Sequence, residues 1–134
     1  MVIVDYVDKI DERGDDIRSR ISAAAERMKR IAERENVALV LLSQLSRRVE
    51  SRPNPKPTNA DLKESGKLEE EADHIIFPFR PWVYDKKAHD PTTAEILVTK
   101  NRGGPIGTFP AYFVGKYFRF LDRDPHGSLQ WRGS

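Results

Sequence analysis

Short apolar runs and one long amphipathic stretch alternate in the first third of the chain. Residues 2–4 and 37–42 are apolar throughout, a pattern typical of buried parallel strands. Between them, over residues 16–35, apolar side chains recur at helical spacing, which predicts a helix with one apolar stripe. A turn and N-cap at residues 14–16 and a left-handed stop at Asn36 bound this helix. The strand–helix–strand order predicts a right-handed parallel crossover.

The middle of the chain predicts a long polar connection followed by a return to regular structure. Residues 47–59 contain several prolines and charges but almost no apolar side chain, which predicts an exposed, mobile loop. A short helix is expected at residues 66–72 and a strand at residues 74–79. Pro78 indicates that this strand ends early or lies at a sheet edge, because proline cannot donate to a ladder of hydrogen bonds.

The last third of the chain predicts a β-hairpin. Apolar and polar residues alternate at 95–100 and 108–114, and the sequence Gly-Gly-Pro at 103–105 joins these two strands. Residues 117–120 predict one more strand. The aromatic residues of this region are Tyr112, Phe113, Tyr117 and Phe118. Such a cluster is typical of a core, and stacking on a nucleobase is the alternative.

Composition narrows the class of protein. The chain of 134 residues is one domain or less, and its net charge of +2 is too small to indicate nucleic-acid binding by itself. No run approaches the roughly 18 apolar residues of a membrane span, and early acids exclude a signal peptide. With no cysteine there is no disulfide framework, and the histidines are too far apart for a metal site. We therefore expect a cytoplasmic protein without a membrane partner.

Two polar residues follow the two predicted parallel strands. Asp5 ends the first apolar run, and Gln44 follows the second. Ligands of open α/β sheets bind at the carboxyl ends of strands, where an acid in nucleotide motors holds Mg²⁺. Many strands, however, end in an aspartate or glutamine that only caps a turn. Each residue alone therefore identifies no site.

Four segments in one order carry a more specific signal: residues 2–6, 41–47, 61–73 and 100–104. Together they resemble the C-terminal ATPase domain of the DnaB-like hexameric replicative DNA helicases, over roughly residues 1–120. The resemblance implies an α/β, partial RecA-like fold: parallel strands with a crossover helix, then an antiparallel β-hairpin. The chain contains no G-x-x-x-x-G-K-[ST] phosphate loop, so the strand that would carry it is expected to be missing. We assign residues 1–121 to this domain part and expect a loosely ordered tail at 122–134.

The resemblance implies a role in nucleotide hydrolysis for four residues. Asp5 corresponds to the acid that holds Mg²⁺, and Gln44 to the glutamine that senses the γ-phosphate and couples it to the DNA-binding loops. Lys100 and Arg102 correspond to cations that reach the triphosphate of a neighbouring subunit, as an arginine finger does. The alternative for this pair is a solvated basic edge that discourages strand aggregation. The implied cofactors are ATP and Mg²⁺.

The resemblance also implies contact with single-stranded DNA at Lys63, Glu64 and Gly66. A glycine permits close approach of the backbone to phosphates, and a lysine adds charge attraction. Lys63 stands where the family usually has arginine, so the charge remains but the planar fork is lost. Glu70 and Glu71 also depart from the commoner pattern. The alternative is an ordinary helix start with a solvated acidic face.

The sequence thus predicts part of an ATP-dependent replicative DNA helicase that translocates on single-stranded DNA and unwinds duplex DNA. We expect the chain to be inactive alone and to self-associate or to join the complementary N-terminal half in a hexameric ring. Two other interpretations stay open. The chain can be a non-catalytic remnant that joins a ring or binds single-stranded DNA. It can also belong to another RecA-like ATPase, although residues 61–73 favour the helicase.

Overall fold

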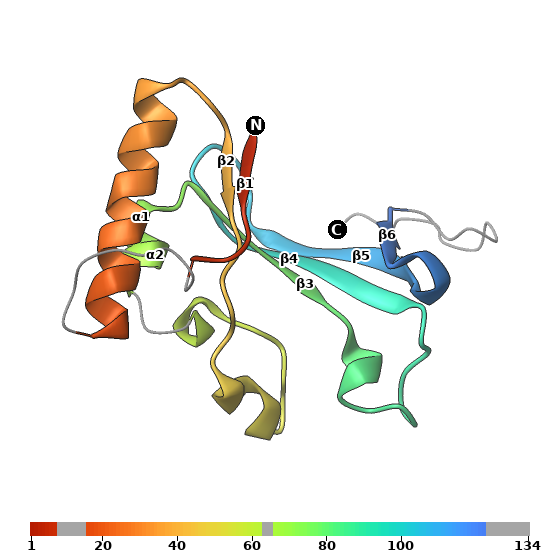
Figure 1. Cartoon of the computed structure of the whole chain (residues 1–134). Coiled ribbons are helices and arrows are strands. Elements are labelled where there is room, and N and C mark those ends of the chain that lie inside the picture. Colours follow the sequence, from red (N-terminus) through yellow and green to blue (C-terminus); the bar gives the residue numbers. More distant parts are fainter. Residues whose placement is uncertain (8–15, 63–65, 123–134) are drawn as a thin grey trace.

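The computed structural model of the protein describes residues 1–7, 16–62 and 66–122. Two helices lie on one side of a two-stranded sheet, and a longer four-stranded sheet extends away from them (Figure 1). The strand order is β1-β2 in the first sheet and β3-β4-β5-β6 in the second. Within the described residues, no helix has the length and apolar character needed to span a membrane.

The first sheet is the predicted parallel crossover. Strand β1 (Val2–Val4) pairs in parallel with β2 (Leu39–Leu41), and helix α1 (Ile17–Arg34) connects them. The Asp16 carboxylate caps α1 by accepting from the Ser19 backbone N–H at 2.7 Å. The predicted helix and strands are confirmed, although β2 is shorter than the apolar run that predicts it.

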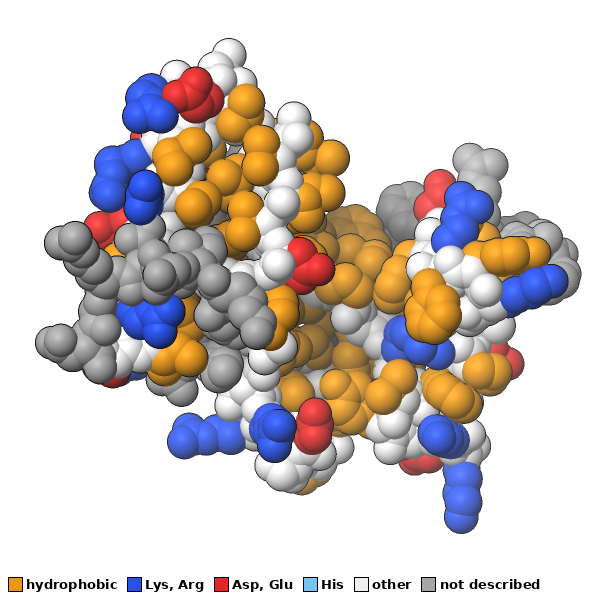
Figure 2. All heavy atoms as spheres, in the orientation of Figure 1, with side chains coloured by type: hydrophobic (Ala, Val, Ile, Leu, Met, Phe, Trp, Pro, Cys, Tyr) orange, Lys and Arg blue, Asp and Glu red, His pale blue; other side chains and the backbone are white. Residues whose placement is uncertain are grey.

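The expectation that both parallel strands are buried is wrong. Ile3 is 59% exposed and Val40 is 41% exposed. Helix α1 covers one face of the pair, where Val7 and Ile21 belong to a small core. On the other face Figure 2 shows hydrophobic side chains at the surface over β1 and β2. An apolar run is compatible with burial on both faces, but only one layer of helix is present to provide it.

Helix α2 (Gly66–Glu71) packs on α1 and matches the predicted short helix. Leu68 is 8% exposed and joins the core formed by residues of α1, among them Ala24 and Ala25. Glu69 and Glu70 of α2 are exposed, as expected for an amphipathic helix. The next strand starts within a few residues of Glu71, so α2 and the second sheet are held close together.

The second sheet is antiparallel throughout and confirms the predicted hairpin. Its strands are β3 (His74–Phe79), β4 (Thr93–Asn101), β5 (Gly107–Val114) and β6 (Arg119–Leu121). Strand β3 lies at the sheet edge, which agrees with the position of Pro78. On one face, Phe77 and Phe79 of β3 pack with Leu97 of β4. The register places Ile96 of β4 opposite Phe109 of β5.

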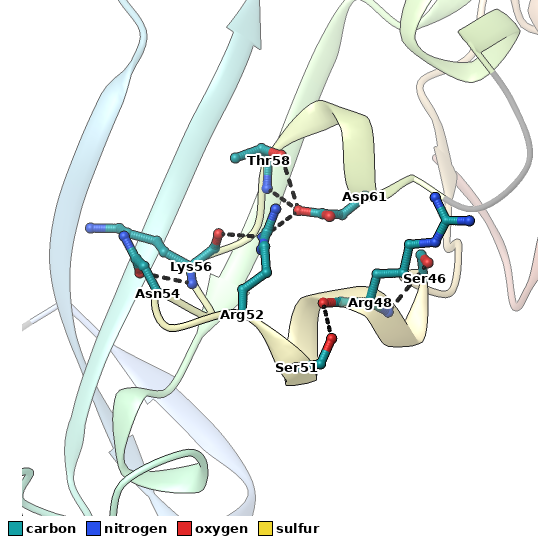
Figure 3. A network of polar contacts seen from close by, with 8 residues as sticks. All are labelled: Ser46, Arg48, Ser51, Arg52, Asn54, Lys56, Thr58 and Asp61. Atoms are coloured by element: carbon teal, nitrogen blue, oxygen red, sulfur yellow. Dashed lines mark hydrogen bonds and ion pairs between the residues drawn. The ribbon is translucent and has the colours of Figure 1, made fainter.

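The prediction of an exposed, mobile loop at residues 47–59 is also wrong. Residues Arg47–Ser51 form a 3-10 helix in which Val49 is only 3% exposed. Arg52 donates to the carboxylate of Asp61 at 2.7 Å and to the Lys56 carbonyl at 3.0 Å (Figure 3). The ammonium of Lys56 lies 2.6 Å from the carboxylate of Glu95 on β4. These polar contacts replace the apolar contacts that the segment lacks, and the Lys56 pair attaches it to the second sheet.

Candidate functional site

Asp5 and Gln44 lie at the same edge of the parallel sheet. Val4 is the register partner of Leu41, so both chains leave the sheet at their carboxyl ends together. Two backbone hydrogen bonds continue the pairing: Leu42 N–H to the Val4 carbonyl at 3.0 Å, and Val7 N–H to the Leu42 carbonyl at 2.8 Å. Both side chains are exposed. The edge therefore offers a carboxylate and an amide to one ligand.

The chemistry available at Asp5 is that of a single carboxylate. Among the described residues there is no group of three or more His, Cys, Asp or Glu side chains that could hold a metal ion. Mg²⁺ is commonly held by one or two carboxylates together with water and substrate phosphates. Asp5 thus suits a cation that arrives with a nucleotide, and does not suit a resident metal held by protein ligands alone.

The residue after Gln44 connects this edge to the segment that the sequence suggested for DNA. Leu45 forms an isolated antiparallel bridge with Leu62, and the Ser46 N–H donates to the Asp61 carbonyl at 2.8 Å. Leu62 immediately precedes residues 63–65 in the sequence. A shift of the backbone at Gln44 is therefore transmitted to the start of that segment through main-chain hydrogen bonds.

Lys63 and Glu64 lie outside the described residues, so their predicted DNA contact stays a prediction. Gly66 opens α2 and is exposed. No atom lies within 4 Å of the place where a Cβ would stand on Gly66. The fold itself thus leaves room for a side chain at this position, and the surface around the Gly66 backbone is open to a ligand.

Lys100 and Arg102 both turn towards the junction between α2 and β3. The Lys100 ammonium donates to the Glu70 carbonyl at 3.0 Å and also to the Glu69 carbonyl. The Arg102 guanidinium donates to a carboxylate oxygen of Asp73 at 3.0 Å. The expectation that both cations point to one side agrees with these contacts. The expectation that they stand at the hairpin tip does not, because both bond back to their own chain.

Asp73 is a polar centre that the sequence analysis did not single out. Its second carboxylate oxygen accepts from Lys29 of α1 at 2.6 Å. The Lys29 ammonium, with help from Arg102, holds the pKa of Asp73 below the usual range. The sequence signal for this contact is weak, since Lys29 and Asp73 are 44 positions apart. Only an acidic residue directly before a strand marked the place.

Asp61 is a second such centre and the one polar residue among the buried side chains described, at 5% exposure. Its carboxylate accepts from the Thr58 N–H at 2.8 Å and the Thr58 hydroxyl at 3.0 Å, besides Arg52 (Figure 3). Burial raises the pKa of Asp61, but the bonds from Thr58 and Arg52 outweigh it and leave the pKa below the usual range. Asp61 therefore stays charged and fixes the segment before residues 63–65.

The aromatic cluster divides into core and surface. Phe113 is buried beneath the Arg80 guanidinium, which lies 3.7 Å from the ring centre, whereas Phe118 is 84% exposed. A nearby cavity of about 220 Å³ has mostly apolar walls. Its lining residues are Leu45, Pro57, Pro78, Phe79, Arg80, Val83, Tyr84 and Phe120. None of the four aromatic residues considered for nucleobase stacking lines this cavity.

Comparison with known proteins gives one consistent match. The family model for the DnaB-like helicase C terminal domain matches residues 1–122. The Replicative DNA helicase DnaC of Bacillus subtilis (strain 168) is 36% identical over 125 residues, which cover 91% of this chain and 28% of that protein. The Replicative DNA helicase DnaB of Haemophilus influenzae is 38% identical over 122 residues, covering 90% of this chain and 26% of that protein. The chain thus spans about a quarter of the length of these relatives.

Solved structures agree with the sequence comparison. One of them, the structure of an isolated ATPase domain, superposes with a TM-score of 0.85 at 34% identity, over 92% of this chain and 44% of that one. A DnaB-like replicative helicase whose interactions with primase have been described gives a TM-score of 0.85 at 34% identity, over 92% of this chain and 31% of that one. The α/β fold predicted from the sequence is therefore confirmed.

Proposed function

The chain belongs to the DnaB-like helicase C-terminal domain family, and from that membership we propose that it works as part of an ATP-dependent replicative DNA helicase. In this role it translocates on single-stranded DNA and unwinds duplex DNA in the cytoplasm, within a hexameric ring. The observation that carries the proposal is the shared edge of β1 and β2, where Asp5 and Gln44 leave the sheet together. ATP and Mg²⁺ are the proposed cofactors.

Asp5 would hold Mg²⁺, directly or through water, between the sheet edge and the phosphates. Gln44 would donate its amide to the terminal phosphate and thereby detect whether that phosphate is present. The bridge between Leu45 and Leu62 supports a coupling of this signal to the DNA-binding segment, because it joins the two backbones directly. Lys63, Glu64 and Gly66 of that segment would contact the DNA backbone without reading bases.

Lys100 and Arg102 would act on the triphosphate bound by a neighbouring subunit. The Arg102 side chain, 63% exposed, is accessible to such a ligand even while paired with Asp73. An arginine finger contributes on the order of a thousandfold or more to phosphoryl transfer. This role requires that the guanidinium leave its own chain, a requirement that Lys100 shares for its ammonium.

The proposal predicts that hydrolysis needs a second polypeptide part. The 134-residue chain contains no phosphate loop motif, so we expect no ATPase activity from it when purified alone. Mixing it with a polypeptide that supplies the phosphate-loop part of the domain should yield Mg²⁺-dependent hydrolysis, measured as phosphate release. Asp5→Ala should reduce that activity about a hundredfold or more, because the metal loses its protein ligand.

Glu50→Ala is the matched control, since Glu50 is an exposed acid on the 3-10 helix away from the sheet edge. It should leave phosphate release unchanged. Robust Mg²⁺-dependent hydrolysis by the chain alone, or activity in the mixture that ignores Asp5→Ala, would overturn the assignment of the site.

A further inference from the structure

Asp73 receives both a side-chain and a main-chain contact from Arg102. The guanidinium donates to the Asp73 carboxylate at 3.0 Å, and the Arg102 backbone N–H donates to the Asp73 carbonyl at 2.9 Å. The main-chain bond holds the base of the Arg102 side chain next to the junction of α2 and β3. The side-chain bond then directs the guanidinium back onto its own subunit. These are two separate constraints on the same residue.

The Asp73 carboxylate is already satisfied without Arg102. Lys29 of α1 donates to the other carboxylate oxygen at 2.6 Å, and the Lys29 side chain is the more buried partner, at 22% exposure against 63% for Arg102. An unpaired acid would resist separation from its only partner. Here the departure of Arg102 leaves Asp73 still paired with Lys29. The guanidinium can therefore alternate between Asp73 and another anion at low cost.

Lys100 attaches the same hairpin to the end of α2. Its ammonium lies against the Glu69 and Glu70 carbonyls near the C-terminus of the helix, where the helix dipole favours a cation. Together with the contacts of Asp73, this ties Lys100 and Arg102 to one short helix. That helix begins directly after residues 63–65, the proposed DNA segment. Any displacement of α2 therefore changes the hold on both cations at once.

We propose that Asp73 is a positioning residue that keeps Arg102 withdrawn from the neighbouring triphosphate, and that movement of α2 when DNA binds releases it. The inference rests on the proposed finger role of Arg102. A triphosphate carries more negative charge than one carboxylate, so it outcompetes Asp73 once α2 has shifted. The Arg102 N–H bond to the Asp73 carbonyl keeps the finger aligned until then.

The test is a comparison of hydrolysis with and without single-stranded DNA in the assembled ring. Asp73→Asn removes the charge while keeping the side chain's shape. We expect the DNA-free turnover rate to rise and the factor of stimulation by DNA to fall on the order of fivefold, a typical coupling between two sites. Glu70→Gln is the matched control, because the Glu70 carboxylate pairs with Lys67 and its carbonyl contact with Lys100 is unaffected. It should leave the stimulation factor unchanged.

A double variant separates positioning from a structural role. If Asp73 acts through Arg102, the effect of Asp73→Asn on the stimulation factor disappears in an Arg102→Ala background. An effect that persists there, or equal loss of both rates in the single variant, overturns the inference. If Arg102→Ala alone hydrolyses ATP normally in a verified ring, the finger role itself is wrong. If Arg102→Ala is impaired but Asp73→Asn leaves stimulation intact, only the role of Asp73 is wrong.

Discussion

Asp61 and Asp73 organise the polar contacts of this chain at the scale of single residues. Each carboxylate gathers donors from other segments: Arg52 and Thr58 for Asp61, Lys29 and Arg102 for Asp73. The two residues lie on either side of the proposed DNA segment in the sequence. Bonds from charged donors are stronger than neutral ones, so these two residues set how rigidly that segment is framed.

Replacing Asp61 tests this frame. Asp61→Asn should lower the free energy of unfolding by about 2 kcal/mol, because the buried site loses its bond between ions. The pKa of Asp61 is lower in the folded state, so its charge contributes stability fully above the ordinary value of 3.8. That contribution is lost as the pH falls through the lower, folded pKa. Urea unfolding should therefore show a gap between wild type and variant at pH 7 that narrows below about pH 4.

Glu50→Gln, at an exposed position, is the control for this series and should show no gap at any pH. A gap for Asp61→Asn that is absent at pH 7, or that widens as the pH falls, would contradict the assigned role of Asp61.

Gly66 allows the DNA contact to be tested without damage to the fold. The space for a Cβ is open, and alanine favours a helix by up to about 1 kcal/mol over glycine, so Gly66→Ala should leave stability unchanged or higher. Binding to labelled single-stranded oligonucleotides should nevertheless weaken, because a side chain then keeps the DNA backbone from the peptide. Binding should be salt-sensitive and independent of sequence. Unchanged affinity would remove Gly66 from the proposed interface.

At the scale of elements, α2 connects the helical layer to the second sheet. Leu68 inserts into the core of α1, while the end of the helix receives Lys100 from β4. One six-residue helix thus carries an apolar contact on one side and a polar contact on the other. Its position is set by tertiary packing, because so short a helix has little stability by itself.

Removing the apolar contact should therefore release α2. Leu68→Ala is expected to destabilise the chain by about 2–5 kcal/mol, the usual effect of emptying a core site of this size. Ile76→Ala is the matched control, since Ile76 is an apolar residue of β3 that is 55% exposed, and it should change stability by less than about 0.5 kcal/mol. Thermal unfolding followed by circular dichroism gives both values. Equal effects would show that α2 does not depend on this core.

At the scale of the whole molecule, the two sheets remain separate. β1 and β2 lead to the proposed nucleotide-facing residues Asp5 and Gln44, whereas Lys100 and Arg102 belong to the second sheet and its turn. Several apolar residues are exposed on or beside the first sheet: Met1, Val2, Ile3, Val40 and Leu42. This division suits a ring in which Asp5 serves the subunit's own nucleotide and Arg102 serves the neighbour's.

Mixed rings test the division directly. Arg102→Ala and Asp5→Ala rings should each lose DNA-stimulated hydrolysis by orders of magnitude, while Arg102→Ala subunits still bind nucleotide. Rings assembled from both variants should regain part of the activity, because some interfaces pair an intact Asp5 with an intact Arg102. Phosphate release measured against the mixing ratio reports this recovery. Its absence in verified mixed hexamers would show that the two residues do not act across an interface.

The sequence by itself determined the elements and the residues at strand ends. Periodicity along neighbouring positions specified α1, β3 and the β4–β5 hairpin, and the same pattern placed Asp5 and Gln44 after parallel strands. These features depend on contacts within a few residues or on one repeating register, so the order of side chains is sufficient to predict them.

Only the tertiary structure decided where the charges pair and which apolar surfaces are covered. Charge and proline content predicted a mobile loop where Arg52 and Asp61 in fact form a fixed frame. Likewise, Arg102 lies against Asp73, which also pairs with Lys29 across 44 positions of sequence. An ion pair requires only that two opposite charges meet in space, and any acid in the chain satisfies that requirement equally well in sequence. The choice among them follows from how α1, α2 and β4 pack together.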